Sequence, residues 1–412
     1  MRVLVVDEWI PLPLDSGKKI RTFQLLSPLA RRHSITYLCY ADVRREAGKI
    51  AKMEEAGFRM VCVPPVRKFD TPVKLAAGVL ANFLRPAPLA VRKHYSRPFQ
   101  QVLDRLATEH RLDLIHCEWT HYAQFVRQLR DRPRFLCAHN VESMHWERFV
   151  RVARNPLRRA ILRLESLKMA RFERRAIAEF DHVAAVSTED VERMKASFGA
   201  HSADVIPNGV DMEFYAAVNH SGNGESLIYC ASMDSFVNQD AVFYFVERIL
   251  PKILEKKPQV RFMIVGRSPP PAIRRLAGDH ISVSGSVDDI RPFLGSATAS
   301  VVPLRIAGGS RLKILESIAA GLPVVSTSIG AEGLRLQAGS QLLIANDESS
   351  FASQCVRLLD QSHLREQLVR AGRVQLKEKY EWKSIVPLVE AAWQRARRNF
   401  VDNRTRGTGA YR

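Results

Sequence analysis

Short apolar runs alternate with longer amphipathic stretches along the first half of the chain. The runs expected to form strands are Val3–Val6, Ile35–Cys39, Met60–Val63, Leu114–Cys117, Arg134–Ala138 and His182–Val186. The stretches between them, such as Ile20–His33 and Arg97–His110, predict helices. Strands that alternate with helices indicate a parallel sheet covered by helices on both faces.

A second series of apolar runs begins near residue 225. Its expected strands are Ser226–Cys230, Val260–Val265, Ile281–Gly285, Ala299–Pro303 and Pro323–Ser326, and helical patterns follow over Ser349–Leu359, His363–Tyr380 and Trp382–Phe400. A turn-rich joint, Val205–Asp211, separates the two series. We therefore expect an α/β fold of two Rossmann-like domains, with a hinge near residues 205–225 and a disordered tail over residues 401–412.

The length and the cysteine pattern agree with this division. A chain of 412 residues is too long for one ordinary core and suits two domains. The six cysteines are scattered and contain no Cys-x-x-Cys pair, so we expect reduced thiols in a cytoplasmic protein. No run of about 18 apolar residues predicts a membrane-spanning helix.

The charge of the chain is uneven. The net charge is +19, and residues 1–200 hold 36 Lys and Arg against 22 Asp and Glu, which gives that half +14. The first half is therefore expected to face a polyanion or an anionic membrane surface. Nucleic acid is the competing ligand, but the chain contains no zinc-finger, RRM or basic-zipper pattern, and we expect no nucleic-acid partner.

One segment combines an anion site with a carboxylate. The strand expected at Ala299–Pro303 is followed by Gly308–Ser310, which opens a helix that carries Arg311, Lys313 and Glu316. The start of a helix offers unpaired N–H groups and the positive end of the helix dipole, so anions bind there. The segment therefore predicts a pyrophosphate clamp beside a carboxylate that binds hydroxyls, and a nucleotide-sugar has both groups.

Several motifs occur in an order that resembles the retaining GT-B glycosyltransferases of the large group 1 family. They are the loop Pro13–Gly17 followed by Arg21, His139-Asn140, Val186-Ser187, the hinge Ile206–Asp211, Phe262–Gly266, Gly285–Ile290, and the clamp helix that ends in Gly-Leu-Pro-Val-Val. The resemblance extends over nearly the full length. It implies two facing Rossmann-like domains with an interdomain cleft: residues 1–205 bind the acceptor, residues 206–381 bind the nucleotide-sugar, and a helix at about 382–400 crosses back to the first domain.

The resemblance also assigns roles to residues of the clamp. Glu316 matches the glutamate that binds the ribose hydroxyls, although by itself it would read as a surface glutamate that pairs with Lys313. The glutamate expected eight residues earlier is replaced by Gly308. The backbone N–H groups of Gly308, Gly309 and Ser310 are the expected substitutes, because glycine permits close approach.

Phosphate binding departs from the family pattern as well. Many relatives carry an arginine and a lysine after the first strand of the donor domain, but here Cys230–Asn238 contains no cation. We therefore assign the charge of the phosphate site to Arg311 and Lys313, which would stabilise the pyrophosphate leaving group.

Four further residues are assigned by the resemblance. His139 is placed beside the donor sugar, with a purely structural histidine as the alternative, and Gly17, Gly266 and Val287 are placed at the donor. The chain has no Asp-x-Asp motif. His116 and His121 suggest a metal site without a third ligand at a sensible spacing, so neither a metal nor a cofactor is expected.

The stretch Arg148–Arg175 holds ten basic residues, and Leu157, Ile161, Leu164, Leu167 and Met169 interleave with them at roughly helical spacing. Such a helix suits an anionic membrane, and an ordinary amphipathic helix with a solvated face is the alternative. We expect a peripheral association with the inner face of the plasma membrane.

The resulting hypothesis is a metal-independent retaining glycosyltransferase. It would move a sugar from a nucleotide-sugar to a hydroxyl of a glycan or lipid-linked acceptor, in the synthesis of surface polysaccharide or glycolipid. A GT-B sugar-nucleotide epimerase and a catalytically idle nucleotide-sugar-binding protein are the alternatives.

Overall fold

The computed structural model describes residues 1–65, 78, 81–82, 85–109, 111–153, 155–222, 224–306 and 312–409. The chain divides into two compact units. Unit 1 consists of Met1–Pro207 and Val386–Arg412, and unit 2 consists of Asn208–Ile385.

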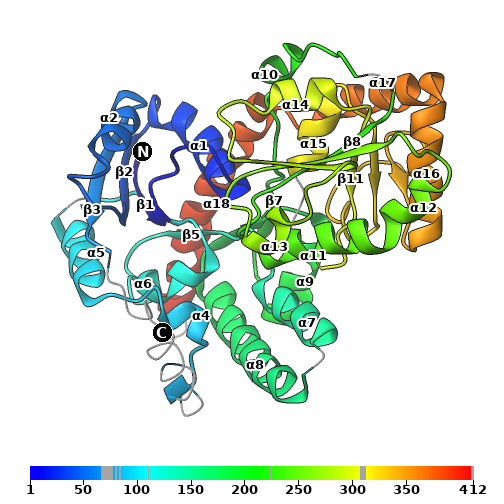
Figure 1. The fold of residues 1–412 in the computed structure, drawn as a ribbon. Coiled ribbons are helices and arrows are strands. Elements are labelled where there is room, and N and C mark those ends of the chain that lie inside the picture. The colour runs from blue at the N-terminus through cyan, green and yellow to red at the C-terminus, as the bar shows by residue number, and fades with distance from the viewer. Residues whose placement is uncertain are drawn as a thin grey trace. The chain divides into compact units, whose positions relative to one another are not determined.

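Unit 1 is built on a parallel sheet of seven strands in the order β3-β2-β1-β4-β5-β6-β7 (Figure 1). The strands are β1 (Arg2–Trp9), β2 (Ser34–Tyr40), β3 (Phe58–Val63), β4 (Leu114–Cys117), β5 (Arg134–Cys137), β6 (His182–Ala185) and β7 (Ala203–Val205). The central strands are buried on both faces, as the continuous apolar runs predicted. The strand order reverses between β1 and β4, and ligands of open α/β sheets bind at such a point, beyond the carboxyl ends of the strands.

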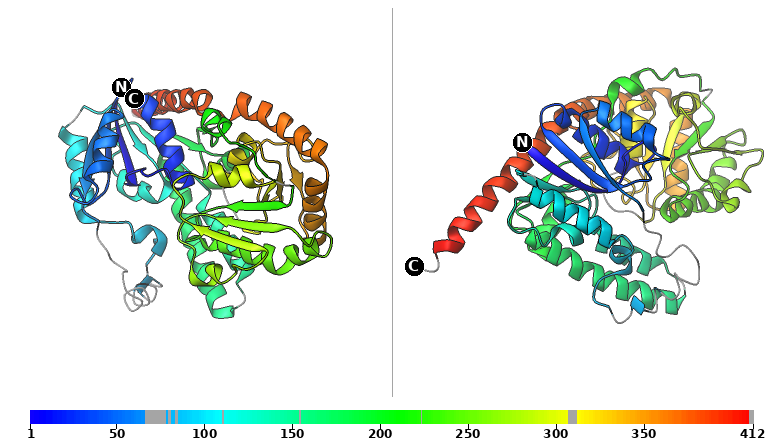
Figure 2. Two further views of the ribbon diagram at one scale, coloured as in Figure 1. Left: turned by 45° about the horizontal axis from the view of Figure 1, so that its top comes forward. Right: turned by 90° about the vertical axis from the view of Figure 1, so that its left-hand side faces the viewer.

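Helices cover both faces of this sheet (Figure 2). They are α1 (Gly17–Ala30), α2 (Ala47–Glu55), α4 (Leu89–Arg92), α5 (Arg97–Glu109), the 3₁₀ turn η1 (Thr120–Tyr122), α6 (Ala123–Val126), α7 (Glu142–Val152), α8 (Pro156–Glu179) and α9 (Thr188–Phe198).

The basic stretch at Arg148–Arg175 is divided between two helices, contrary to the single helix expected. α7 ends at Val152, and α8 begins at Pro156 with Asn155 as its N-cap, whose side chain accepts a hydrogen bond from the Arg158 backbone N–H. Proline at the first helical position and asparagine before it are common at helix starts, which explains the break.

The last helix, α18 (Trp382–Gly409), begins in unit 2 and belongs to unit 1 from Val386 onward. Trp393 is completely buried in unit 1, and Glu390 lies 2.8 Å from His33 Nε2. Asn399 Nδ2 donates to the Asp181 carbonyl at 2.9 Å. The helix continues to Gly409, beyond residue 400, where the disordered tail was expected to begin.

Unit 2 is built on a parallel sheet of six strands in the order β10-β9-β8-β11-β12-β13. The strands are β8 (Ser226–Cys230), β9 (Arg261–Val265), β10 (Ile281–Gly285), β11 (Ala299–Val302), β12 (Val324–Ser326) and β13 (Leu343–Ile344). This sheet and that of unit 1 confirm the predicted α/β fold. The short strands β7 and β13 were not predicted, and the two residues of β13 carry too little pattern to predict a strand.

The helical segments of unit 2 precede, separate and follow its strands. They are α10 (Met212–Ala216), α11 (Phe236–Tyr244), the π-helical turn η2 (Phe245–Ile249), α12 (Leu250–Leu254), α13 (Pro271–Arg274), α14 (Arg291–Ser296), α15 (Leu312–Ala319), α16 (Glu348–Asp360) and α17 (Ser362–Lys379). All six cysteines are free thiols. Within the described residues, no helix is both long enough and apolar enough to cross a membrane.

Candidate functional site

The predicted clamp is only partly described. Gly308, Gly309, Ser310 and Arg311 lie outside the described residues, so their predicted roles stay predictions. The description resumes at Leu312, where α15 begins, and it places Lys313 in the first turn of that helix.

Lys313 reaches the segment that follows β8. Its Nζ donates to Tyr229 Oη and to Asn238 Oδ1, each at 2.9 Å, and lies 4.5 Å from the centroid of the Tyr229 ring. The segment Cys230–Asn238 has no cation of its own, as the sequence showed. In the fold, α15 supplies a cation to it.

A second cation reaches the same segment, and the sequence analysis did not single it out. Arg267 Nε donates to Ser232 Oγ at 2.6 Å, and its guanidinium lies 3.5 Å from the Asp234 carboxylate. Its signal in the sequence is its position directly after Gly266, at the carboxyl end of a parallel strand, where ligand-binding residues of α/β sheets gather.

Gly266 brings the two segments close together. Its φ is +147°, and a Cβ at this position would lie 1.8 Å from the Ala231 carbonyl oxygen. Only glycine fits both the backbone conformation and this approach. The predicted contact of Gly266 with the donor stays a prediction, as does that of Val287, which is half-buried in the loop between β10 and α14.

Glu316 is half-buried one turn beyond Lys313, and the Tyr215 hydroxyl bonds to its carboxylate. Burial raises the pKa of Glu316 above its usual value, although the bond from Tyr215 and the charge of Lys313 act in the opposite direction. A half-buried carboxylate has spare lone pairs for a pair of hydroxyls.

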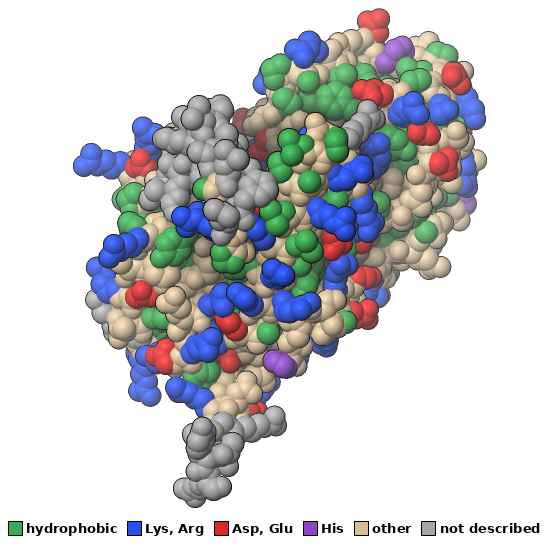
Figure 3. Space-filling model, turned by 90° about the horizontal axis from the view of Figure 1, so that it is seen from below, with side chains coloured by type: hydrophobic (Ala, Val, Ile, Leu, Met, Phe, Trp, Pro, Cys, Tyr) green, Lys and Arg blue, Asp and Glu red, His purple; other side chains and the backbone are tan. Residues whose placement is uncertain are grey.

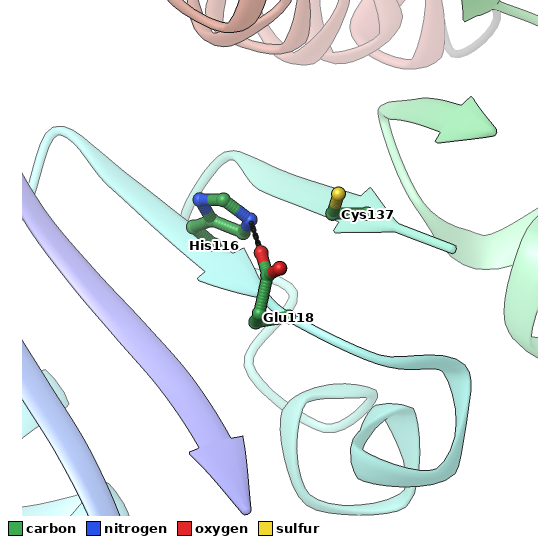
Figure 4. A group of neighbouring side chains, drawn as sticks. All are labelled: His116, Glu118 and Cys137. Atoms are coloured by element: carbon green, nitrogen blue, oxygen red, sulfur yellow. Dashed lines mark ion pairs between the residues drawn. The ribbon is translucent and has the colours of Figure 1, made fainter. Parts of the chain in front are cut away.

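In unit 1, polar residues gather at the carboxyl ends of β4 and β5. His116 and Glu118 lie two positions apart on one strand, and Cys137 and His139 lie two positions apart on the next, so each pair faces the same side. The strands pair in register, with Cys117 opposite Leu136, which places Glu118 beside Cys137. Figure 4 shows Glu118 pointing toward His116, with the Cys137 thiol nearby.

Glu118 is the centre of this group and is almost completely buried. One carboxylate oxygen lies 2.7 Å from His116 Nε2, and the other lies 3.0 Å from His139 Nε2 and accepts a 2.9 Å hydrogen bond from Thr22 Oγ1. Burial alone would raise the pKa of Glu118, but its contacts with His116 and His139 outweigh burial and hold that pKa well below its usual value.

The two histidines suggested as metal ligands belong to different groups. A ring nitrogen of His116, a Glu118 oxygen and Cys137 Sγ lie within 4.8 Å of one another. His121 instead lies against the Trp119 ring, with 3.9 Å between centroids, and 3.9 Å from the Glu142 carboxylate. The sequence analysis missed Glu118 and Cys137, although each stands two positions from a histidine, Glu118 from His116 and Cys137 from His139.

Gly17 is exposed at the start of α1, close to a buried ion pair. The Nζ of the next residue, Lys18, lies 2.7 Å from the Asp7 carboxylate, 3.5 Å from that of Glu8 and 4.6 Å from the centroid of the Trp119 ring. This group of residues stands where β1 and β4 end, at the reversal of strand order.

Arg21, one turn further along α1, has a structural role. Its guanidinium donates to the carbonyls of Ile206 at 2.7 Å and Pro207 at 2.6 Å, and it is almost completely buried. It therefore holds the end of the first segment of unit 1 against α1, at the start of the predicted hinge.

Two family profiles match the chain one after the other. Residues 21–214 match Glycosyltransferase Family 4, and residues 224–361 match Glycosyl transferases group 1.

Among curated proteins, a phosphatidyl-myo-inositol mannosyltransferase of Mycolicibacterium smegmatis is 28% identical over 188 residues, which is 43% of this chain and 48% of the relative. The chain thus spans about half the length of this relative. An uncharacterized 44.6 kDa protein in the cps region of Klebsiella pneumoniae is 22% identical over 255 residues, 59% of this chain and 64% of that protein.

Solved structures share the fold over almost the whole chain. Sucrose-phosphate synthase from Thermosynechococcus elongatus has a TM-score of 0.70 at 15% identity, covering 95% of this chain and 98% of that one. Anabaena HepE in complex with UDP-glucose has a TM-score of 0.68 at 13% identity, covering 96% and 99%. At these identities the likeness concerns the fold, which is the GT-B fold.

Proposed function

The chain belongs to the group 1 glycosyltransferases, and on that basis we propose that it transfers a sugar from a nucleotide-sugar to a hydroxyl of a glycan or lipid-linked acceptor, with retention of anomeric configuration. Unit 2 binds the donor and unit 1 binds the acceptor. No metal takes part in the transfer.

One observation supports the donor most strongly: α15 presents a cation and a carboxylate on the same side, one turn apart. Lys313, directed at the segment after β8, neutralises the diphosphate together with Arg267 and Arg311. Glu316 accepts hydrogen bonds from the ribose hydroxyls. A nucleoside diphosphate offers a diphosphate to the cation and ribose hydroxyls to the carboxylate, whereas an isolated anion would not use the carboxylate.

The chemistry follows from the charge that develops on the leaving group. The acceptor oxygen bonds to the anomeric carbon as the bond from that carbon to the phosphate oxygen breaks, and both events occur on the same face of the sugar. The acceptor proton passes to an oxygen of the leaving diphosphate. Lys313 stabilises the diphosphate as its negative charge grows, and loss of one such donor typically costs a factor of about 10²–10³ in kcat. His139 hydrogen-bonds a hydroxyl of the transferred sugar.

We propose that the product is a surface polysaccharide or a glycolipid. Two relatives support this assignment, one a mannosyltransferase that by its name acts on a phosphatidyl-inositol and the other encoded in a cps region.

The exposed side of α8 suits contact with a membrane, where a lipid-linked acceptor would lie. Arg163, Leu167, Arg171 and Arg174 lie along one stripe of this helix, and all four side chains are exposed. The buried side of the helix includes Met169 and Phe172. Figure 3 views the molecule from below the view of Figure 1, and the face it draws carries Lys and Arg side chains scattered among apolar and acidic ones. We propose that this stripe contacts anionic lipid, with each basic residue contributing about 1 kcal/mol near the surface.

A thermal-shift panel of UDP-glucose, GDP-mannose and ADP-glucose tests the donor site. A donor present at 100 times its Kd stabilises the folded protein by about 2.7 kcal/mol and raises the melting temperature. Lys313→Ala and Glu316→Ala should each abolish the shift, whereas Lys256→Ala, at an exposed position in unit 2, should preserve it. Undiminished shifts in both site variants would overturn the assignment.

Turnover of the donor that binds separates the alternatives. Transfer to an acceptor, or slow hydrolysis without one, supports a transferase. An epimerase would change the sugar of the donor in the absence of any acceptor. A catalytically idle protein, for which the replacement of the first family glutamate by Gly308 is the best argument, would bind the donor and leave it intact.

A further inference from the structure

We infer that Glu118 is a positioning residue that holds His139 in a single tautomer, with its Nε2 protonated and its Nδ1 presented to the substrate as a hydrogen-bond acceptor. The inference deepens the proposed function and rests on it for the role of His139, but the tautomer can be measured independently.

The assignment starts from Trp393, on the buried part of α18. Its indole nitrogen donates to His116 Nδ1 at 3.2 Å, and an indole N–H can only donate. His116 Nδ1 must therefore be the unprotonated nitrogen, which leaves the proton of a neutral ring on Nε2. That nitrogen lies 2.7 Å from an oxygen of the Glu118 carboxylate.

Glu118 also fixes which ring nitrogen of His139 carries the proton. An ionised carboxylate only accepts hydrogen bonds, and the contacts with His116 and His139 keep this carboxyl ionised. The His139 nitrogen that faces it, Nε2 at 3.0 Å, must therefore be a donor. Burial lowers the pKa of His139 below its usual value, so the ring is neutral near pH 7 and Nδ1 keeps its lone pair.

The free side of the ring is available for a ligand. Among the residues that the structure describes, none donates a hydrogen bond to His139 Nδ1. A hydroxyl of a bound sugar would supply the missing donor. Glu118 therefore determines whether His139 accepts a hydrogen bond from the sugar or donates one to it.

A metal ion is the competing explanation for the group, because His116, Glu118 and Cys137 offer three ligand atoms within 4.8 Å. A cation would need the lone pair of His116 Nε2. The indole already occupies the lone pair of Nδ1, so metal binding would leave the ring without a proton on either nitrogen. Burial also raises the pKa of Cys137 to about 12, which keeps it a thiol rather than the thiolate that metals bind. The observed distances therefore favour a carboxylate held between two protonated ring nitrogens, rather than a metal site.

The first experiment is ¹⁵N NMR of the wild-type protein labelled at histidine, with the His139 signals assigned from the His139→Asn variant. The ring-nitrogen shifts should report the Nε2–H tautomer near pH 7. A predominant Nδ1–H tautomer, or a charged ring, would overturn the inference. So would stoichiometric zinc in the purified protein that is lost in Cys137→Ser.

The Glu118→Gln variant gives a sharper result. An amide has one acceptor and one donor, and because His116 still presents an N–H, the amide oxygen must face His116. The amide NH₂ then faces His139 Nε2 and forces the proton of His139 to Nδ1. We expect the His139 tautomer to invert in this variant, while His182, held by Ser202 and Asp204, keeps its shifts.

Donor turnover provides the functional readout. With the nucleotide-sugar identified by the thermal-shift panel, Glu118→Gln should lower kcat by a factor on the order of 10²–10⁴, with little change in KM. Glu165→Gln, which alters another buried carboxylate bonded to Asn82 and Leu89, should retain activity. In a His139→Ala background, Glu118→Gln should lower kcat little further, because Glu118 acts through His139.

An equal loss in the two backgrounds would contradict the positioning role, as would an unchanged His139 tautomer in folded Glu118→Gln. Absence of turnover with every nucleotide-sugar would overturn the proposed function alone, since the wild-type tautomer measurement needs no activity.

Discussion

At the scale of single residues, Gly266 shows how closely the loops at the candidate donor site approach one another. Replacing it with alanine would combine a positive φ with a Cβ that meets the Ala231 carbonyl. We expect Gly266→Ala to reduce the free energy of unfolding by about 2–5 kcal/mol, from backbone strain and overpacking together. Urea denaturation of the purified variant measures this loss.

A matched control lies in unit 1. Gly48 is in the first turn of α2, and a Cβ there would have no heavy atom within 4 Å. Gly48→Ala should therefore be neutral or should stabilise by about 0.5–1 kcal/mol. A small effect at both glycines would show that the β8 and β9 loops are less tightly joined than the structure indicates.

The buried carboxylate of Glu118 makes stability depend on pH. Its pKa in the folded protein is lower than in the unfolded chain, so its contribution is present above the unfolded value of about 4.5 and is lost as the pH falls. Glu118→Gln should be less stable than wild type by about 1.5–3 kcal/mol at pH 7, the range for hydrogen bonds to a charged group. Denaturation curves between pH 3.5 and 8 should show this difference shrinking below about pH 4.5. A difference that grew on acidification would contradict the ionised state.

At the scale of the element, the exposed stripe of α8 predicts salt-sensitive binding to anionic membranes. The combined Arg163→Glu, Arg171→Glu and Arg174→Glu variant should lose binding to phosphatidylglycerol vesicles, because about 1 kcal/mol per basic residue is removed and negative charge is added. Cosedimentation with vesicles at two salt concentrations measures the effect.

The control variant reverses three exposed basic residues of unit 2, Lys256, Arg275 and Arg370. It changes the net charge equally and should bind vesicles as wild type does. If the two variants lose binding equally, the total charge of the protein would account for binding, and α8 would have no special part.

Much of the fold was predictable at this scale. Buried parallel strands are continuous apolar runs, and β4, β8 and β10 have the bounds that their runs predicted. The break between α7 and α8 was missed, although Asn155-Pro156 was a readable signal for it. Leu157 and Leu167 share the spacing of core residues and yet are exposed, because spacing alone does not say which face of a helix finds a partner.

The candidate site was less predictable, because its contacts join residues far apart in the sequence. Lys313 lies 75 positions from Asn238, and nothing local to α15 shows that its ammonium bonds to the segment after β8. His139 could be named from the resemblance, but its partner Glu118 required the register of β4 and β5. Such contacts are set by strand order, which a single sequence does not encode locally.

At the scale of the whole molecule, α18 completes unit 1. Trp393 is fully buried, where its indole bonds to His116 and its ring meets that of His33 edge-on. Trp393→Ala should destabilise unit 1 by about 3–5 kcal/mol, the usual cost of removing a buried tryptophan. Hydrogen exchange followed by mass spectrometry should show faster exchange in β1, β2 and β4.

Unit 2 serves as the internal reference in that experiment. Exchange in β8, β9 and β11 should stay close to wild type, because Trp393 belongs to the other unit. Uniformly faster exchange throughout the chain would mean that the two units unfold as one cooperative body.

Because the chain returns to unit 1 at Val386, the last part of unit 1 is synthesised after the whole of unit 2. Unit 2 can emerge whole from the ribosome before the last segment of unit 1 has been synthesised. Until that segment arrives, the surface of unit 1 that receives Trp393 stays uncovered, and His116 lacks the donor that sets its protonation. In the nascent protein, unit 2 can therefore fold first, while the group of His116, Glu118 and His139 in unit 1 is completed last.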